Sequence, residues 1–227
     1  MYSTKQKGEP TIEQFSSYQA LYHYFNKKLF SGELPPIILN FSRKDKTAGF
    51  FAPNRWVSQS GENKTHEISI NPSYMARVPF IEVCQTLVHE QAHLWQMLFG
   101  KPSRKGYHNK EWAKKMEAIG LMPSSTGQEG GNTVGQKMSD YVLPGGQFEK
   151  VFKSLPESLG LPWVANEETA AAAPGNGAEQ GEQEEEKPPK KKTKVKYTCP
   201  QCGTNLWGKP KLEVYCKPCE NYMVEEK

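Results

Sequence analysis

Residues 88–96, with the sequence VHEQAHLWQ, place two histidines four positions apart and a glutamate directly after the first. An α-helix turns about 100° and rises about 1.5 Å per residue, so His89 and His93 would lie one turn apart on the same face. Both imidazoles could then reach one metal ion, and Glu90 on the flank could take a proton from water without being a ligand. This is the pattern of the HExxH zinc hydrolases.

The apolar setting of these three residues favours a metal site over ordinary packing. A single histidine on a helix usually packs in the core or faces solvent. Here the flanking stretches VCQTLV and LWQMLF are mostly apolar. Burying a carboxylate and two imidazoles in such a helix costs free energy unless these groups are paired or bind a metal. We therefore predict that His89 and His93 bind zinc and that Glu90 is the catalytic base.

A catalytic zinc site needs a third protein ligand and an open fourth position. Gln96 and Phe99 occupy the positions where the metzincin extension requires glycine and histidine, so that class is excluded. His108, in the stretch GYHNKEW, begins the next predicted helix and could return to the metal face. Glu111 and Glu117 are the alternatives, because gluzincins use a carboxylate as the third ligand. Spacing alone leaves these alternatives open.

Four cysteines near the C-terminus form a second candidate metal site. Cys199 and Cys202, and then Cys216 and Cys219, are two C-x-x-C pairs separated by thirteen residues. Each pair offers two thiolates, and the intervening GTNLWGKPKLEVY is long enough for a small β-hairpin that closes a tetrahedral site. A redox C-x-x-C fits less well, because the pair is doubled and no βαβ pattern surrounds it. We predict a zinc ribbon whose zinc is structural.

Lysines and aromatic residues around these cysteines indicate a nucleic-acid partner. Trp207, Tyr197 and Tyr215 could present flat faces to unstacked bases. Lysine runs bind phosphate without reading sequence, so we expect nonspecific, salt-sensitive DNA binding. The alternative is that the aromatic side chains pack the hairpin and the lysines only solvate the tail. The lysines that lead into the first cysteine are Lys187, Lys190, Lys191, Lys192, Lys194 and Lys196.

Charge is segregated along the 227 residues, whose net charge is +4. Residues 164–186 contain seven glutamates and no lysine or arginine, residues 187–227 contain ten lysines and four glutamates, and residues 1–163 carry the remaining +5. Residues 164–196 have few large apolar side chains, so we expect a disordered linker, acidic and then basic. It would join a metallopeptidase domain over residues 1–163 to a zinc ribbon over residues 197–227.

The N-terminal sequence MYSTKQKGEPTIEQF has no apolar stretch behind a positive start, and no segment reaches the roughly 18 apolar residues of a membrane span. We therefore expect a cytoplasmic protein, nucleoid-associated in a bacterium, that has no membrane partner and is a monomer. Cys84 is expected in the core of the long helix. His23 and His66 have no partner at a spacing that predicts a site.

Several elements must position the histidines. Apolar residues spaced by three and four predict a helix over residues 11–29. Short strands are predicted at residues 37–41, in AGFFAP and in HEISINP, and are followed by a long helix over residues 79–99 that carries the first motif. A second helix, over residues 108–119, follows the break GKPSRKG. The fold class is therefore α+β.

Residues 122–146 are rich in glycine and serine, and only residues 141–143 have the character of a strand. The glycines form neither G-x-G-x-x-G nor a P-loop. We interpret the segment as a flexible rim or lid over the cleft. A short amphipathic stretch over residues 148–159 follows it.

Across most of residues 18–120 the sequence resembles the SprT-like zinc metallopeptidases, through YHYFNKKLFSGELPP, AGFFAP, EISINPS, LVHEQAHLWQ and YHNKEWAKKM in this order. The resemblance implies a zincin-like domain in which His89, His93 and His108 bind zinc and Glu90 is catalytic. It also implies a C-terminal zinc-binding segment and protein substrates on DNA. The Gly-rich segment is longer than the family pattern implies, which leaves its role open.

These observations together predict an α+β protein with a zincin-like metallopeptidase domain and a small four-cysteine zinc ribbon. It would hold two zinc ions, one catalytic and one structural, and cleave DNA-associated or DNA-crosslinked proteins. The alternative function is that of a nucleic-acid-binding adaptor that holds metal and cleaves nothing. The intact Glu90 argues against this alternative.

Overall fold

The computed structural model describes residues 8–44, 47–166 and 195–226, and the chain divides into two compact units. The described part of the first unit ends at Asn166, and that of the second begins at Val195. Nearly all of the expected linker lies outside the described residues. No described helix is both long enough and apolar enough to cross a membrane.

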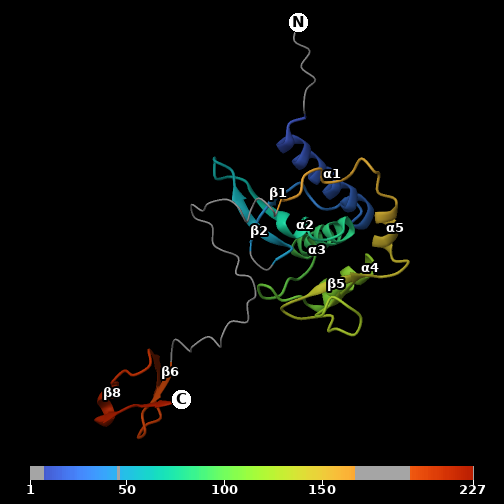
Figure 1. The fold of residues 1–227 in the computed structure, drawn as a ribbon. Helices are drawn as coiled ribbons and strands as arrows, with labels where there is room; N and C mark the ends of the chain where they lie inside the picture. The colour runs from blue at the N-terminus through green and yellow to red at the C-terminus, as the bar shows by residue number, and fades with distance from the viewer. Residues whose placement is uncertain (1–7, 45–46, 167–194, 227) are drawn as a thin grey trace. The chain divides into compact units, whose positions relative to one another are not determined.

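The first unit combines helices with a small mixed sheet (Figure 1). Its first half contains α1 (Pro10–Leu29), β1 (Ile38–Phe41), β2 (Gly49–Val57), β3 (Lys64–Ile70), α2 (Pro72–Met75) and α3 (Phe80–Phe99). Its second half contains α4 (Lys110–Ala118), β4 (Leu121–Ser124), β5 (Ser139–Val142) and α5 (Gln147–Lys153). The three long helices and the three first strands confirm the predicted order of elements, and the mixed composition confirms that helices and strands share this unit.

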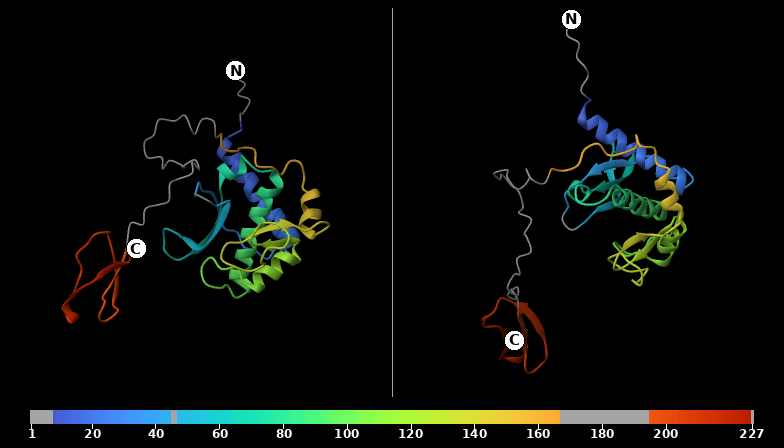
Figure 2. Two further views of the ribbon diagram at one scale, coloured as in Figure 1. Left: turned by 60° about the horizontal axis from the view of Figure 1, so that its bottom comes forward. Right: turned by 45° about the vertical axis from the view of Figure 1, so that its right-hand side comes forward.

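The central helix α3 lies between the sheet and the rest of the unit. The sheet has the order β1-β3-β2, with β1 parallel and β2 antiparallel to β3. The helix α3 contacts β2 and β3 as well as α1 and α4, and the views in Figure 2 show the sheet and α4 around it. A helix with neighbours on several sides must be apolar around most of its circumference, as the sequence of α3 is.

The first helix covers the core with the predicted stripe, except at its start. Pro10 suits the first helical position, where the missing N–H has no partner in any helix. Tyr18 and Phe25 are fully buried, but Ile12 and Phe15 of the same stripe are 59% and 39% exposed. After the helix, Gly32 adopts a φ of +76° and its N–H donates to the Asn26 carbonyl 3.0 Å away, which terminates the helix.

The Gly-rich segment contains more β-structure than the sequence indicated. Only residues 141–143 were expected as a strand, but β4 pairs antiparallel with β5, with Leu121 opposite Val142 and Ser124 opposite Ser139. The strand β4 was missed because it follows Gly120 directly and contains Pro123, a residue that argues against a strand. Gly120 has a φ of +89°, which turns the chain out of α4 and into β4.

The second unit is built from short strands around the cysteines. It contains β6 (Val195–Thr198), β7 (Asn205–Gly208), β8 (Tyr215–Cys216), the 3-10 turn η1 (Lys217–Cys219), β9 (Asn221–Tyr222) and β10 (Val224–Glu226). The strand order is β10-β6-β7 in one antiparallel sheet, and β8 pairs with β9. The hairpin expected between the two C-x-x-C pairs is therefore wrong. Instead, the β6–β7 hairpin encloses the first C-x-x-C pair and the β8–β9 hairpin encloses the second. Two short paired strands can hold the two cysteines of one pair close together.

Candidate metal centres

Three histidines of the first unit converge on one point. Each offers a ring nitrogen, and these nitrogens all lie within 4.8 Å of one another in His89, His93 and His108. The Nε2 atoms of His93 and His108 are 3.0 Å apart. Tetrahedral zinc with Zn–N bonds of about 2.0–2.1 Å would separate its ligand nitrogens by about 3.3 Å. The donor chemistry and the spacing therefore fit a zinc ion, which the three imidazole nitrogens could bind.

Two acceptors fix the orientation of two of these rings. Asp140 Oδ2 lies 3.1 Å from His89 Nδ1, and the Gly135 carbonyl lies 3.2 Å from His108 Nδ1. Each Nδ1 donates its proton to the oxygen, which leaves the Nε2 lone pair for a metal. Gln85 in turn donates from Nε2 to the Asp140 carboxylate at 2.9 Å and to its carbonyl at 2.7 Å. The carboxylate is therefore itself held in place.

Trp112 forms a wall beside all three histidines. It lies on α4, is fully buried, and its ring centroid is 4.8 Å from that of His89, 5.1 Å from that of His93 and 4.5 Å from that of His108. Its plane is inclined only 18° to the ring of His93, so these two rings stack. One large apolar side chain therefore restricts the rotamers of the three candidate ligands at once.

The connection between α3 and α4 places His108. Asn109 caps α4 by accepting from the Trp112 N–H at 3.0 Å, and its side chain also contacts Gln96 and the Lys101 carbonyl. Glu111 accepts from Gln96 at 2.8 Å and from the Lys101 N–H at 2.6 Å. Glu111 thus holds the connection together, while His108 is the residue beside the two helix histidines. The exposed Glu117 is not in the cluster either.

Glu90 lies on the same helix but outside the ligand cluster. Its side chain is buried, with 7% of the residue exposed, and it accepts a hydrogen bond from the backbone N–H of Phe51 on β2. Gly49 allows β2 to lie close to α3, since a Cβ there would meet Thr86 Cγ2 at 2.9 Å and Glu90 Cγ at 3.7 Å. Burial raises the pKa of Glu90, whereas the neighbouring His89 and the Phe51 hydrogen bond lower it.

The electrostatic surroundings differ between the three histidines. Burial, together with the neighbouring imidazoles of His89 and His108, holds the pKa of His93 well below its usual value. Burial and His89 lower the pKa of His108 to about 4. Burial opposes protonation of His89 too, but the Asp140 hydrogen bond and the charges of Glu90 and Asp140 raise its pKa. Neutral rings bind metal, and a more basic ring is a stronger ligand.

The four cysteines of the second unit also converge. One sulfur from each of Cys199, Cys202, Cys216 and Cys219 lies within 4.8 Å of the others. The sulfurs of Cys202 and Cys216 are 3.8 Å apart, close to the separation of about 3.8 Å expected for Zn–S bonds of about 2.3 Å in a tetrahedron. A disulfide would need about 2.05 Å. Hydrogen bonds from Thr204 lower the pKa of Cys202 to about 6, which favours its thiolate.

One of the three expected base-stacking residues of the ribbon is part of its core. Tyr197 is only 1% exposed, and its hydroxyl donates to the Lys209 carbonyl at 2.7 Å and accepts from the Leu212 N–H at 2.9 Å. The expectation of a free face on Tyr197 is therefore wrong, because so small a unit must bury its largest central ring. Trp207 and Tyr215 are 64% and 51% exposed.

Two comparisons with known proteins bear on this arrangement. Residues 18–130 match the SprT-like family. The chain is also 37% identical over 59 residues to a Salmonella typhimurium protein described as an uncharacterized protein in the mucB 3' region, an alignment that covers 26% of this chain and 80% of that protein. The chain belongs to the SprT-like family. Membership suggests a metallopeptidase-like domain, and the matched residues include the whole histidine cluster and Glu90.

The SprT-like match ends before two residues that the histidine cluster uses, Gly135 and Asp140. Asp140 lies ten residues beyond the matched range, in the segment interpreted from sequence as a rim or lid. Trp112, Gln85 and Gly135 were also missed as parts of the site, although all four lie in or near the cluster. One signal was available for Asp140. It is one of two aspartates in the chain and directly precedes the stretch that was expected to be a strand.

Cys84, His23 and His66 take the roles expected of them. Cys84 is 1% exposed within α3 and belongs to the apolar core, and burial raises the pKa of its thiol. His23 lies on α1, where its ring contacts Gln19. His66 lies in β3 and accepts from the Asn54 N–H at 3.0 Å. None of the three belongs to a metal cluster among the described residues.

Proposed function

We propose that this SprT-like chain is a zinc-dependent endopeptidase with a zincin-like catalytic domain. One observation carries the proposal: three histidine nitrogens that could hold a metal converge within 4.8 Å, and Glu90 follows the first of these histidines on the same helix. Zinc bound to three imidazoles supplies Lewis acidity, which acidifies water and polarises a carbonyl group. His89, His93 and His108 would hold it.

The residues of the chain then have separate tasks. Glu90 takes a proton from the attacking water as a new C–O bond forms, and passes it to the departing amine as the peptide C–N bond breaks. Its raised pKa, which follows from burial, suits a group that must accept and release a proton near neutral pH. Asp140 and Gly135 orient His89 and His108 and keep the correct nitrogen free.

We further propose that the substrates are proteins bound or crosslinked to DNA. The support is the charge of the C-terminal part, where residues 187–227 contain ten lysines and four glutamates. The exposed rings of Trp207 and Tyr215 provide surfaces for unpaired bases. Lys196 lies on β6 of the ribbon, and the five lysines before it lie outside the described residues. Together these features would hold the protease near proteins on DNA without reading sequence.

A cleavage assay tests the proposal. The zinc-loaded full chain is incubated with a small basic DNA-binding protein, with and without DNA, and products are resolved by gel and mass spectrometry. We expect cleavage that increases with DNA, and a loss of at least about a hundredfold in Glu90→Gln, because a general base contributes about 10²–10⁴ in rate. Glu117→Gln, which removes an exposed carboxylate of α4, is the matched control and should cleave normally.

The same assay distinguishes the adaptor function. A chain that binds DNA and holds both metals but yields no products with any protein on DNA would be an adaptor rather than a protease. Cleavage that Glu90→Gln retains would also contradict the proposal, since it would come from another enzyme or another mechanism.

A further inference from the structure

One short segment of the first unit carries as much net charge as the whole of residues 1–163. Residues 101–115 contain six basic residues and one glutamate, a net charge of +5, and residues 1–163 together also have +5. We call these six side chains the basic corner. They are Lys101, Arg104, Lys105, Lys110, Lys114 and Lys115. The rest of the first 163 residues is therefore neutral overall.

The basic corner lies on consecutive parts of the chain, from the end of α3 to α4. It covers the connection between α3 and α4 and the outer side of α4, whose inner side carries the buried Trp112. Lys115 is half-buried and the other five basic residues are exposed. None of the six forms an ion pair within the described part of the chain, and the carboxylate of Glu111 is already bonded to Gln96 and the Lys101 N–H. The positive charge is thus largely uncompensated.

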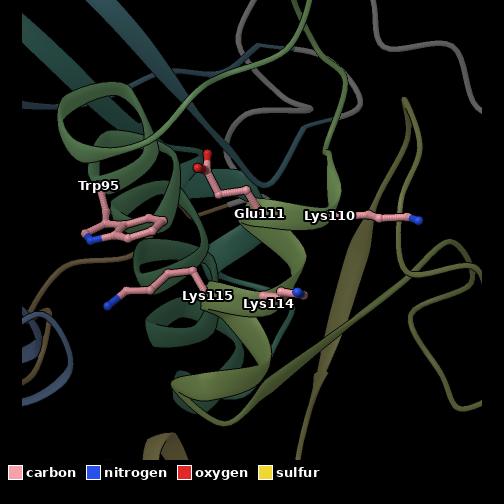
Figure 3. A pocket seen from close by; sticks show the side chains of 5 residues that line it. All are labelled: Trp95, Lys110, Glu111, Lys114 and Lys115. Carbon is pink, nitrogen blue, oxygen red and sulfur yellow. The ribbon is translucent and has the colours of Figure 1, made fainter.

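A hollow of about 430 Å³ lies within this surface. It is lined by Trp95, Lys110, Glu111, Lys114 and Lys115 (Figure 3). In Figure 3 the indole of Trp95 extends from α3 and the Lys115 side chain extends from α4 on the same side, whereas Lys110 extends from α4 in the opposite direction. No histidine of the metal cluster lines the hollow, which makes this a surface separate from the site of hydrolysis.

Aromatic rings accompany the cations at this corner. Lys115 Nζ lies 4.9 Å from the ring centroid of Trp95, and the Arg104 guanidinium lies 5.3 Å from that of Tyr107. The ring of Phe99, at the end of α3, is 54% exposed. Cations that follow a backbone, mixed with flat rings, are the features that bind a nucleic-acid strand, whereas an acidic peptide needs only the cations.

We infer that the basic corner binds the phosphate backbone of a nucleic-acid strand. The exposed lysines and Arg104 contact phosphates, and the part of the Trp95 indole that is exposed beside Lys115 contacts a base at the hollow. The inference rests on the nucleic-acid part of the proposed function and not on hydrolysis. It assigns a second contact, on the catalytic unit itself, in addition to the lysine tail and the ribbon. A strand held there would lie on the helix that also carries Trp112.

Binding of fluorescein-labelled oligo(dT) of about 20 nucleotides, followed by anisotropy in the full Glu90→Gln chain, tests this. The corner variant combines Arg104→Gln, Lys105→Gln, Lys110→Gln and Lys114→Gln. The control variant removes four exposed lysines of the same unit, with Lys27→Gln, Lys28→Gln, Lys64→Gln and Lys150→Gln. Both variants change the net charge equally, so general electrostatic attraction changes equally. Thermal unfolding by circular dichroism checks that both remain folded.

We expect the corner variant to lose at least about tenfold in affinity, and its log–log salt slope to fall by up to about three, because each phosphate contact on a single strand contributes about 0.7. The control variant should stay close to the parent. Equal binding by corner and control variants would overturn the inference while leaving the lysine tail as the DNA contact. Absence of binding in the parent chain would instead contradict the nucleic-acid part of the proposed function. Displacement of the strand by polyglutamate at equal charge concentration would assign the surface to acidic polypeptides.

Discussion

The histidine cluster and the cysteine cluster bring metal donors to similar separations, but they are assembled in different ways. The three histidines come from a 20-residue helix and from the connection after it, and their orientation depends on Trp112 and on a strand 51 residues beyond His89. The cysteines belong to two short hairpins within 30 residues of chain. The apolar core around the histidines is large, whereas the ribbon core contains Tyr197, Cys199, Cys216 and Met223 as its buried members.

This difference indicates which of the two units needs its metal in order to fold. A unit with four buried apolar residues, two of them cysteines, gains little from burial alone, and such units fold when metal binds. The first unit buries a broad set of side chains from helices and sheet and does not need a metal to hold its backbone. The fold of the first unit therefore positions the histidines before any metal binds, whereas metal binding by the cysteines is needed to fold the second unit.

The largest expected effect is loss of ribbon structure in Cys216→Ser. Structural zinc contributes about 10–16 kcal/mol to small zinc-binding units, far more than this core provides. Amide hydrogen exchange measured by mass spectrometry should show residues 195–226 unprotected and α3 unchanged. Cys84→Ser, which also changes a buried cysteine, is the matched control and should leave the ribbon protected. A ribbon that stays protected in Cys216→Ser would break the contrast between the two units.

A smaller and more local effect is expected for His108→Ala. Loss of one of three ligands should remove the metal of the first unit at micromolar free zinc while the four-cysteine site remains loaded. Metal content by inductively coupled plasma mass spectrometry should fall from two zinc ions per chain to one, with α1 and α3 still protected from exchange. Glu111→Gln, which keeps an acceptor oxygen for Gln96 and the Lys101 N–H, should keep both zinc ions. The opposite result for these two variants would make Glu111 the third ligand.

Asp140→Asn should weaken the same metal without removing a ligand. The amide cannot hold the His89 proton as the carboxylate does, and loss of such a partner typically lowers metal affinity or activity by about 10–100-fold. Competition with a fluorescent zinc chelator measures the change. Glu149→Gln, which removes a carboxylate at the surface, should have no such effect. If Asp140→Asn binds zinc as tightly as the parent, contacts with Trp112 and the backbone are enough to orient the His89 ring.

The smallest effect is expected at the exposed ring of the ribbon. Trp207→Ala should change the stability of the zinc-loaded ribbon by no more than about 0.5 kcal/mol, since most of that side chain is already in solvent. Tyr197→Phe should cost more, about 1–3 kcal/mol, because it removes two hydrogen bonds of about 0.5–1.5 kcal/mol each, to the Lys209 carbonyl and from the Leu212 N–H. Chemical unfolding of the full chain, followed by exchange in each unit, separates the two. Reversed magnitudes would mean that Trp207 is a core residue.

Much of this protein is determined by the sequence on its own. The spacing of His89, Glu90 and His93 follows from helix geometry, and two C-x-x-C pairs must face one another whenever they bind one ion. The apolar periodicity of α1 and α3 and the stop signals around Gly32 and Gly100 fix those helices. These patterns are local, so neighbouring residues alone decide them.

Only the tertiary structure decided how the rings of the histidine site are held. His108 was one of three candidates from the sequence, and the Asn109 cap and the Glu111 contacts are what place it beside the other two histidines. Asp140 reaches His89 because β4 and β5 pair, and a strand that contains proline and follows glycine gives no periodic signal. Contacts between residues far apart in sequence depend on how whole elements pack, and no local pattern encodes that packing.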